Sequence, residues 1–198
     1  MYSWYRNLSG EVGIDETDLI SRACQGDTAA WDGLVRQHQE PAFRLAYLIL
    51  GDRADAEDVT QEAFVRAYLK LDTFDGARPF RPWLLSIAAN LARNRRRSIG
   101  RYWAALRRYW QNEPPAAHQP DWGARSEARR LWQAVQRLRP MAQEIIYLRY
   151  FLDLSEAETA VTLDIAPGTA KSRLHRALKQ LRSVIEADFP DLVETWSV

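Results

Sequence analysis

Apolar residues recur at intervals of three and four along most of this chain, and glycine and proline are sparse inside the periodic segments. This spacing lines one face of an α-helix, whereas a half-buried β-strand alternates with period two. We see no signal for a β-hairpin. The sequence therefore predicts an all-α protein with helices at about residues 17–24, 28–50 (broken or kinked at Pro41), 54–71, 79–97, 124–138, 140–150, 155–163 and 167–187.

A polar, proline-rich stretch past the middle of the chain predicts a division into two domains. The segment from Glu113 to Pro120 reads EPPAAHQP and cannot continue a helix. A chain of 198 residues is long enough for two small domains. We expect two small helical domains joined by a flexible linker: an N-terminal extension (1–16), a first domain (17–97), the linker (98–123), a second domain (124–187) and a C-terminal tail (188–198).

Charge is segregated along the chain, although the formal net charge is only +1. Acids dominate from Asp52 to Glu62, whereas the stretch from Arg93 to Arg108 holds seven arginines and no acid. A further basic group lies between Lys171 and Arg182. This arrangement predicts one surface that attracts polyanions and another that offers carboxylates to a different partner.

Several classes of protein are disfavoured by motifs that the sequence lacks. Its start has no apolar signal-peptide core, and no apolar run reaches the roughly 18 residues that span a bilayer, so we expect no membrane insertion. Cys24 is the sole cysteine and the three histidines lie far apart, which leaves no disulfide and no metal-ligand spacing. Nor is there a G-x-S-x-G, H-E-x-x-H or G-x-x-x-x-G-K motif. We expect a cytoplasmic bacterial protein with no catalytic residue, no metal and no cofactor.

The last third of the chain predicts a helix-turn-helix. Ser155 and Glu158 have the spacing of a capping box, so a short helix starts there and ends by about Leu163. A second helix opens around Pro167 after a turn of three or four residues. One apolar stripe on this helix is expected to anchor it, leaving the basic side chains free for base edges and phosphates: Leu174, Leu178, Leu181 and Ile185.

Two sets of motifs in this chain resemble those of RNA polymerase sigma factors of the sigma-70 family, in its extracytoplasmic-function (ECF) group. The stretches DAEDVTQEAF (55–64) and FRPWLLSIAANLA (80–92) are similar to sigma region 2, and LRPMAQEIIYLRYFLDLS (138–155) with APGTAKSRLHRAL (166–178) is similar to sigma region 4. The resemblance covers about residues 18–97 and 124–182. Asp164 stands where the family usually has glycine in the turn, and Ala170 where it has valine.

The resemblance implies a partner for each surface. Core RNA polymerase would bind Asp58, Gln61 and Glu62, on a helix whose buried side is Ala56, Val59, Ala63 and Ala67. The minus-ten element of promoter DNA would contact Phe74, Asp75, Gly76, Arg78, Asn90, Arg93 and Arg97, beside a buried stripe of Phe80, Leu84, Ile87 and Leu91. The minus-thirty-five element would contact Thr169, Lys171, Ser172, Arg173, His175 and Arg176. An anti-sigma factor is the usual regulator of such proteins.

The sequence alone leaves two questions open, the role of Phe74 and the class of DNA-binding protein. Trp83 is expected in the core, whereas Phe74 suits the core and a stacking platform for an extruded base equally well. A stand-alone helix-turn-helix regulator would explain the C-terminal helices as well as a sigma factor does, but it would not explain the 55–64 motif beside an arginine-rich helix. Such a regulator would bind an operator without polymerase.

Overall fold

The computed structural model describes residues 16–76, 78–107 and 126–195, and every regular element in these ranges is helical. The elements are α1 (Glu16–Cys24), α2 (Thr28–Leu50), α3 (Arg53–Leu69), the 3₁₀ turn η1 (Leu71–Thr73), α4 (Phe80–Arg107), α5 (Ser126–Gln136), α6 (Pro140–Ile146), the π-helical turn η2 (Tyr147–Phe151), α7 (Glu156–Leu163), α8 (Pro167–Asp188) and α9 (Pro190–Thr195). Nearly all of the expected N-terminal extension, most of the linker and the last three residues lie outside the described ranges. The all-α prediction is confirmed.

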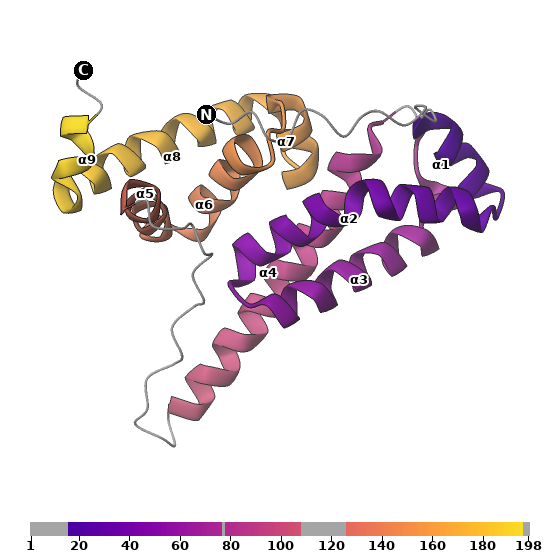
Figure 1. The fold of residues 1–198 in the computed structure, drawn as a ribbon, viewed down its shortest axis with the longest axis horizontal. Coiled ribbons are helices and arrows are strands. Elements are labelled where there is room, and N and C mark those ends of the chain that lie inside the picture. The colour runs from indigo at the N-terminus through magenta and orange to yellow at the C-terminus, as the bar shows by residue number, and fades with distance from the viewer. Residues whose placement is uncertain (1–15, 77, 108–125, 196–198) are drawn as a thin grey trace.

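Helices α1 to α4 form the first domain, in which α2, α3 and α4 pack against one another and α1 packs on the N-terminal half of α2 (Figure 1). Local chemistry sets the helix ends: the Asp27 carboxylate accepts from the amides of Ala29 and Ala30 at the start of α2, and Gly51 takes a left-handed conformation at its end. The helix continues through Pro41 without the expected break. Buried residues on both sides of that proline, such as Leu34 and Leu45, hold it in one piece.

Helices α5 to α9 form the second domain, and α7 packs directly on α4 (Figure 1). One cluster of buried apolar side chains runs from α1 through the first domain into α8, and a smaller one joins α5, α8 and α9 through Ala134, Ile185, Phe189 and Leu192. The segment expected as a tail from residue 188 therefore includes a packed helix. Arg130 of α5 forms an ion pair with Asp191 of α9, which holds that helix in place.

None of the described helices combines the length and the apolarity needed to cross a bilayer.

A buried histidine in the first domain gives a prediction about pH. His38 is 3% exposed and packs 5.2 Å from the Phe80 ring, and its Nε2 lies 3.8 Å from Glu16 Oε1 without a hydrogen bond. Burial, together with the positive charge of Arg81, lowers the pKa of His38 from 6.5 to about 4. Between these values the unfolded chain holds a proton that the folded chain does not, so stability falls as pH falls.

We expect the titration of His38 to lower the free energy of unfolding by about 2 kcal/mol when the pH falls from 8 to 5. Urea denaturation of the wild type and of His38→Leu at both pH values measures the contribution of His38. The other titrating groups are present in both proteins, so their effect on stability cancels in the comparison. The leucine variant should lose that much less stability on acidification. Equal losses in the two proteins would contradict the assignment.

Candidate functional site

The predicted polymerase-binding residues share one exposed face of α3. Asp58, Gln61 and Glu62 all point to solvent at helical spacings of three and four. Glu62 Oε1 accepts a hydrogen bond of 2.5 Å from Arg66 Nη2 on the next turn. The opposite face is buried as predicted, with Ala56, Val59, Ala63 and Ala67 each at most 4% exposed. The sequence period therefore fixes which side of α3 is available to a partner.

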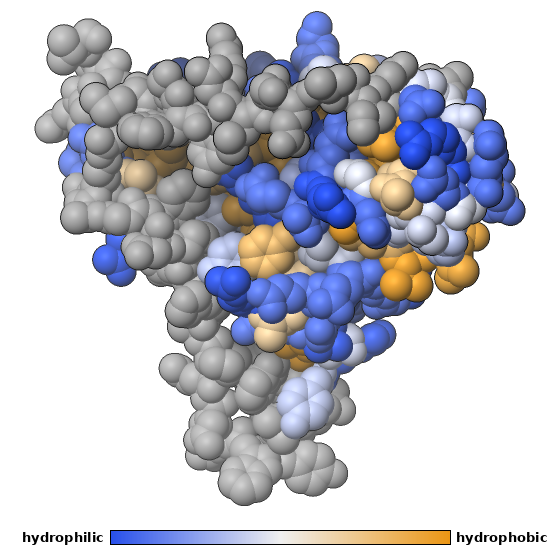
Figure 2. All heavy atoms as spheres, turned by 45° about the vertical axis from the view of Figure 1, so that its right-hand side comes forward, coloured by the Kyte–Doolittle hydropathy of each residue, from blue (hydrophilic) through white to orange (hydrophobic). Residues whose placement is uncertain are grey.

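The same face continues into exposed apolar side chains that the sequence interpretation missed. Val65 and Leu69 follow Glu62 along the stripe and are 58% and 72% exposed, and the neighbouring Tyr68 is 46% exposed. Figure 2, which turns this end of the first domain forward, shows apolar surface among the polar groups there. The spacing was visible in the sequence, but apolar residues at helical spacing normally predict burial. Contiguous exposed apolar side chains are typical of interaction surfaces.

The loop before α4 is fastened to that helix by aromatic packing. The Phe74 ring lies 4.6 Å from the Trp83 ring and 5.7 Å from that of Phe80, and Phe74 is only half-buried. Phe80 is fully buried. Both interpretations of Phe74 keep support, since one part of the ring packs in the core and another faces solvent.

The polar residues of this loop are exposed. Asp75 Oδ2 lies 3.4 Å from Arg78 Nε, and the Arg78 amide donates to the Asp75 carbonyl at 2.9 Å, which closes a tight turn around Gly76. The loop meets α4 at Trp83, and Asn90 lies seven residues, roughly 10 Å, further along the helix axis. The loop and Asn90 therefore border one side of α4 without direct contact.

The polar face of α4 carries Asn90, Arg93 and Arg97. Asn90 and Arg97 are exposed, and Arg93 is half-buried. Arg93 Nη2 donates to Asn90 Oδ1 at 2.5 Å, and Arg93 Nη1 donates to Glu144 Oε2 of α6 at 2.9 Å. The buried stripe of this helix matches the prediction at Phe80, Leu84 and Leu91, while Ile87 is half-buried.

Two other arginines of α4 are already engaged. Arg95 donates to Asp55 Oδ1 of α3 at 2.8 Å through Nε and at 2.5 Å through Nη2. Arg96 Nη2 lies 3.6 Å from Glu144 Oε1, and its Nη1 is 3.5 Å from the Ile49 carbonyl. The basic stretch seen in the sequence is therefore split between solvent and internal partners.

The helix-turn-helix forms as its local chemistry predicts. Ser155 Oγ accepts from the Glu158 amide at 3.2 Å, and the Ser155 amide donates to Glu158 Oε2 at 2.7 Å, which completes the capping box of α7. Asp164 ends α7 with φ 52° and ψ 53°. Aspartate tolerates this left-handed conformation better than most residues, so it fills the turn position that glycine usually takes. Ala170 is 2% exposed, so its small side chain packs in the core of the pair.

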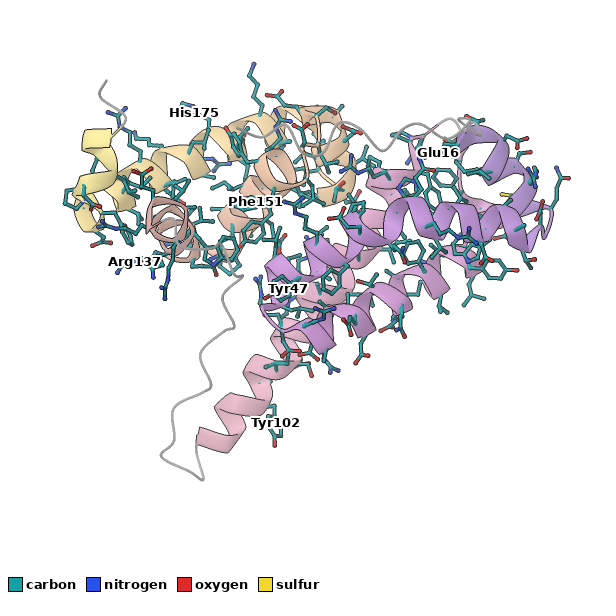
Figure 3. All side chains as sticks on the ribbon, in the orientation of Figure 1. Glu16, Tyr47, Tyr102, Arg137, Phe151 and His175 are labelled. Carbon is teal, nitrogen blue, oxygen red and sulfur yellow. The ribbon has the colours of Figure 1, made fainter. Side chains whose placement is uncertain are left out.

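The N-terminal half of α8 presents the predicted minus-thirty-five residues to solvent. All of them are exposed except Arg173, which is half-buried: Thr169, Lys171, Ser172, His175 and Arg176. His175 lies on the outer side of α8, away from α5 (Figure 3). Ser172 Oγ donates to the Thr169 carbonyl at 3.1 Å, and Arg176 Nε donates to that of Ser172 at 3.3 Å.

The predicted anchor of α8 needs a correction. Ile185 is buried, and Leu174 and Leu181 are half-buried, but Leu178 is 36% exposed. The two alanines Ala170 and Ala177 are the most deeply buried residues of the helix. The side of α8 that packs on α6 and α7 therefore includes the alanines rather than Leu178, because their small side chains let the helices approach closely. Leu178 instead lines an apolar cavity of about 460 Å³ beside α5 and η2.

A basic groove, which the sequence interpretation missed, lies next to this surface. It has a volume of about 570 Å³ between α8 and the turn joining α5 to α6, and its cationic lining residues are Arg137, Arg139, Arg176 and Lys179. Arg137 is oriented by an ion pair with Asp188 and by the Phe189 ring, 5.1 Å from its guanidinium carbon. Arg137 and Arg139 precede Arg176 by more than 35 residues, so only folding brings these charges together.

Comparisons with known proteins agree with this geometry. Residues 34–102 match the family model of sigma-70 region 2, and residues 128–181 match that of sigma-70 region 4. The chain is 33% identical over 173 residues to the ECF RNA polymerase sigma factor SigW of Bacillus subtilis, covering 82% of this chain and 92% of SigW. It is also 33% identical over 169 residues to SigL of Mycobacterium tuberculosis, covering 84% and 95%. The solved structure of CnrH in complex with the cytosolic domain of CnrY aligns with a TM-score of 0.66 at 28% identity, covering 87% of this chain and 98% of CnrH.

Proposed function

The chain belongs to the ECF group of the sigma-70 family of RNA polymerase sigma factors, and from this premise we propose how its surfaces divide the work of promoter recognition. The α3 stripe, which consists of the exposed residues Asp58, Gln61, Glu62, Val65 and Leu69, binds core polymerase. The polar side of α4 with its preceding loop reads the minus-ten element, and the N-terminal half of α8 reads the minus-thirty-five element. The observation that carries the proposal is the exposure of most residues of the three sets on the two domains that match the family models, Phe74, Arg93 and Arg173 being half-buried.

The α3 stripe suits a protein partner that carries basic and apolar groups. Asp58 and Glu62 supply carboxylates, and Val65 and Leu69 add apolar area that becomes buried on docking. Complementary charge steers such an encounter, while the desolvated apolar area contributes affinity. Core RNA polymerase is the proposed partner.

Asn90, Arg93 and Arg97 suit a melted strand of DNA. The Asn90 amide both donates and accepts, as reading a base edge requires. Arginines along the same side of α4 neutralise backbone phosphates whatever the sequence, which is a salt-sensitive contribution. The half-exposed Phe74 ring offers a surface on which an extruded base can stack.

The two DNA-reading surfaces act together only when both domains sit on polymerase. Each covers a short stretch of promoter, so neither gives tight binding by itself. Docking fixes the separation of the domains, and the second contact then becomes effectively intramolecular. The chain contributes no catalytic step in this account, works in the cytoplasm, and is controlled by an anti-sigma factor. The binding of CnrY to CnrH is consistent with such control.

Arg176 is expected to specify one base of the minus-thirty-five element. A bidentate contact with guanine gives about 1–3 kcal/mol of discrimination, so Arg176→Ala in holoenzyme should weaken promoter binding roughly tenfold. The same substitution should remove the preference for that base over the other three. Arg182→Ala serves as a control, since Arg182 lies further along α8 and pairs with Glu186 at 2.7 Å. Retained base preference in Arg176→Ala would contradict this role.

The basic groove is expected to hold a phosphate of the DNA backbone beside the minus-thirty-five element. Arg139→Gln should weaken holoenzyme binding to every promoter to the same extent and reduce the slope of log affinity against log salt by about 0.9. Arg129→Gln removes the same charge from an exposed position of α5 outside the groove and should leave the slope closer to that of the wild type. Equal slopes of log affinity against log salt for the two variants would argue against phosphate binding in the groove.

A further inference from the structure

Helix α4 continues past its predicted end at residue 97 and stops at Arg107. Among its described side chains Ala92 is the last that is buried, and all those from Arg93 to Tyr102 are half-buried or exposed. This end of α4 stands clear of the helices around its first part (Figure 1), and Tyr102, 63% exposed, projects from it (Figure 3). We call residues 97–107 the α4 extension. Packing within the first domain does not account for it, since helices in proteins draw most of their stability from buried faces.

The α4 extension carries charge on the side of α4 that holds the minus-ten residues. At 3.6 residues per turn, Arg97 and Arg101 both lie within about 20° of Asn90 around the helix axis. Both arginines are exposed. Neither forms an ion pair with any residue that the structure describes, unlike Arg95, which pairs with Asp55. A line of exposed polar groups therefore runs from Asn90 into the extension.

The α4 extension lies in a long stretch of chain without acidic residues. No aspartate or glutamate stands between Asp75 and Glu113, whereas nine arginines do. The carboxylates of Asp55 and Glu144 reach α4, and both are paired with other arginines of that helix. An exposed cationic surface of this kind fits a polyanion, and a DNA duplex supplies one phosphate charge per about 1.7 Å of its axis.

The place of the α4 extension in the chain indicates which DNA it meets. The loop with Phe74, which is proposed to hold an extruded base, precedes α4, whereas the extension forms the opposite end of that helix. From there the chain continues to the second domain, which is proposed to read the minus-thirty-five element. This order favours the paired DNA between the two elements as the ligand. From Asn90 to Arg101 the helix rises about 16 Å, the length of roughly five base pairs.

We propose that the α4 extension binds the phosphate backbone of the promoter duplex directly upstream of the minus-ten element. Arg101 makes this contact, and Arg97 lies at its border with the minus-ten surface. The contact falls within about five base pairs of the position that Asn90 meets. It adds affinity without sequence preference, because the phosphates are alike at every base pair. The inference rests on the proposed function for the placement of the minus-ten element on α4.

The first experiment compares wild-type and Arg101→Gln holoenzymes on two short DNAs. One is the single-stranded minus-ten element alone, and the other is a fork in which about ten base pairs of duplex precede that strand. Arg101→Gln should weaken binding to the fork roughly fivefold and reduce the slope of log affinity against log salt by about 0.9. It should leave binding to the single strand unchanged. Arg101→Lys keeps the charge and should restore most of the affinity for the fork.

Arg36→Gln is the matched control, because it removes the same charge from an exposed position of α2. Arg96 of α4 reaches the Ile49 carbonyl of α2, so Arg36 lies roughly 20 Å along α2 from the level at which the extension begins. This variant should keep the affinity and the salt slope of the wild type on both DNAs. Equal losses in Arg36→Gln and Arg101→Gln would show a general charge effect and overturn the proposed contact.

A cross-linking experiment locates the contact on the promoter. Ser98 is exposed between the two arginines in sequence, and Ser98→Cys in a Cys24→Ser background carries a photoreactive aryl azide. Cross-links in the holoenzyme are expected in the duplex within about five base pairs upstream of the minus-ten element. Cross-links confined to the single-stranded part of the fork, or no cross-links to DNA, would overturn the proposal.

The outcomes keep this inference apart from the proposed function. An Arg101→Gln holoenzyme that matches the wild type on the fork would overturn the contact made by the α4 extension and leave the proposed function intact. A wild-type chain that forms no complex with core polymerase would contradict the proposed function and this inference together.

Discussion

Replacing Phe80 with alanine is expected to lower the free energy of unfolding by about 4 kcal/mol. Phe80 is 0% exposed, and its ring lies 5.2 Å from His38, 5.5 Å from Trp83 and 5.7 Å from Phe74. These neighbours come from α2, the loop and α4, so they cannot all move inward to fill the space. The loss adds the transfer free energy of the ring to the cost of the cavity.

Urea denaturation followed by circular dichroism measures this loss. Leu69→Ala is the matched control, since Leu69 is 72% exposed and its truncation should change stability by less than about 0.5 kcal/mol. A loss below about 1 kcal/mol for Phe80→Ala would mean that the aromatic cluster does not hold the loop and α4 together as described.

Reversing the charge of Asp58 is expected to weaken binding to core polymerase roughly a hundredfold. Asp58 is exposed at the polar end of the α3 stripe. An arginine there would place like charges opposite each other in the docked complex, which costs several kcal/mol. The isolated protein should keep its fold, because the position is at the surface and arginine favours a helix.

Glu57→Arg is the control for Asp58→Arg, because it makes the same charge change one residue away and off the stripe. Equilibrium binding of labelled variants to core polymerase should therefore separate the two. Equal weakening would indicate a general electrostatic effect rather than a docking surface, and wild-type binding by Asp58→Arg would remove Asp58 from the surface.

Features set by short sequence segments could be predicted. The three- and four-residue spacing on α3 gave its buried side correctly, and the capping box at Ser155 and Glu158 forms as its spacing indicates. The left-handed Asp164 was also foreseeable, because few side chains other than glycine accept that conformation. These features depend on neighbours within one or two helical turns.

Features that depend on distant segments could not be predicted in this way. Glu144 is followed in sequence by the apolar pair Ile145 and Ile146, yet its burial depends on arginines about 50 positions earlier. Arg139 joins the basic groove only because α6 packs on α8. Leu178 was expected in the core, but two alanines on the neighbouring side of α8 pack more closely than a leucine could.

The most direct test of the central claim is to mix the purified chain with bacterial core RNA polymerase and to map transcripts from genomic fragments that core polymerase alone ignores. The account predicts a stable complex and new, discrete start sites, with Asn90→Ala and Arg176→Ala reducing initiation at different promoter elements. No binding to core polymerase, together with tight binding of the free protein to duplex DNA, would contradict it and identify a stand-alone helix-turn-helix regulator.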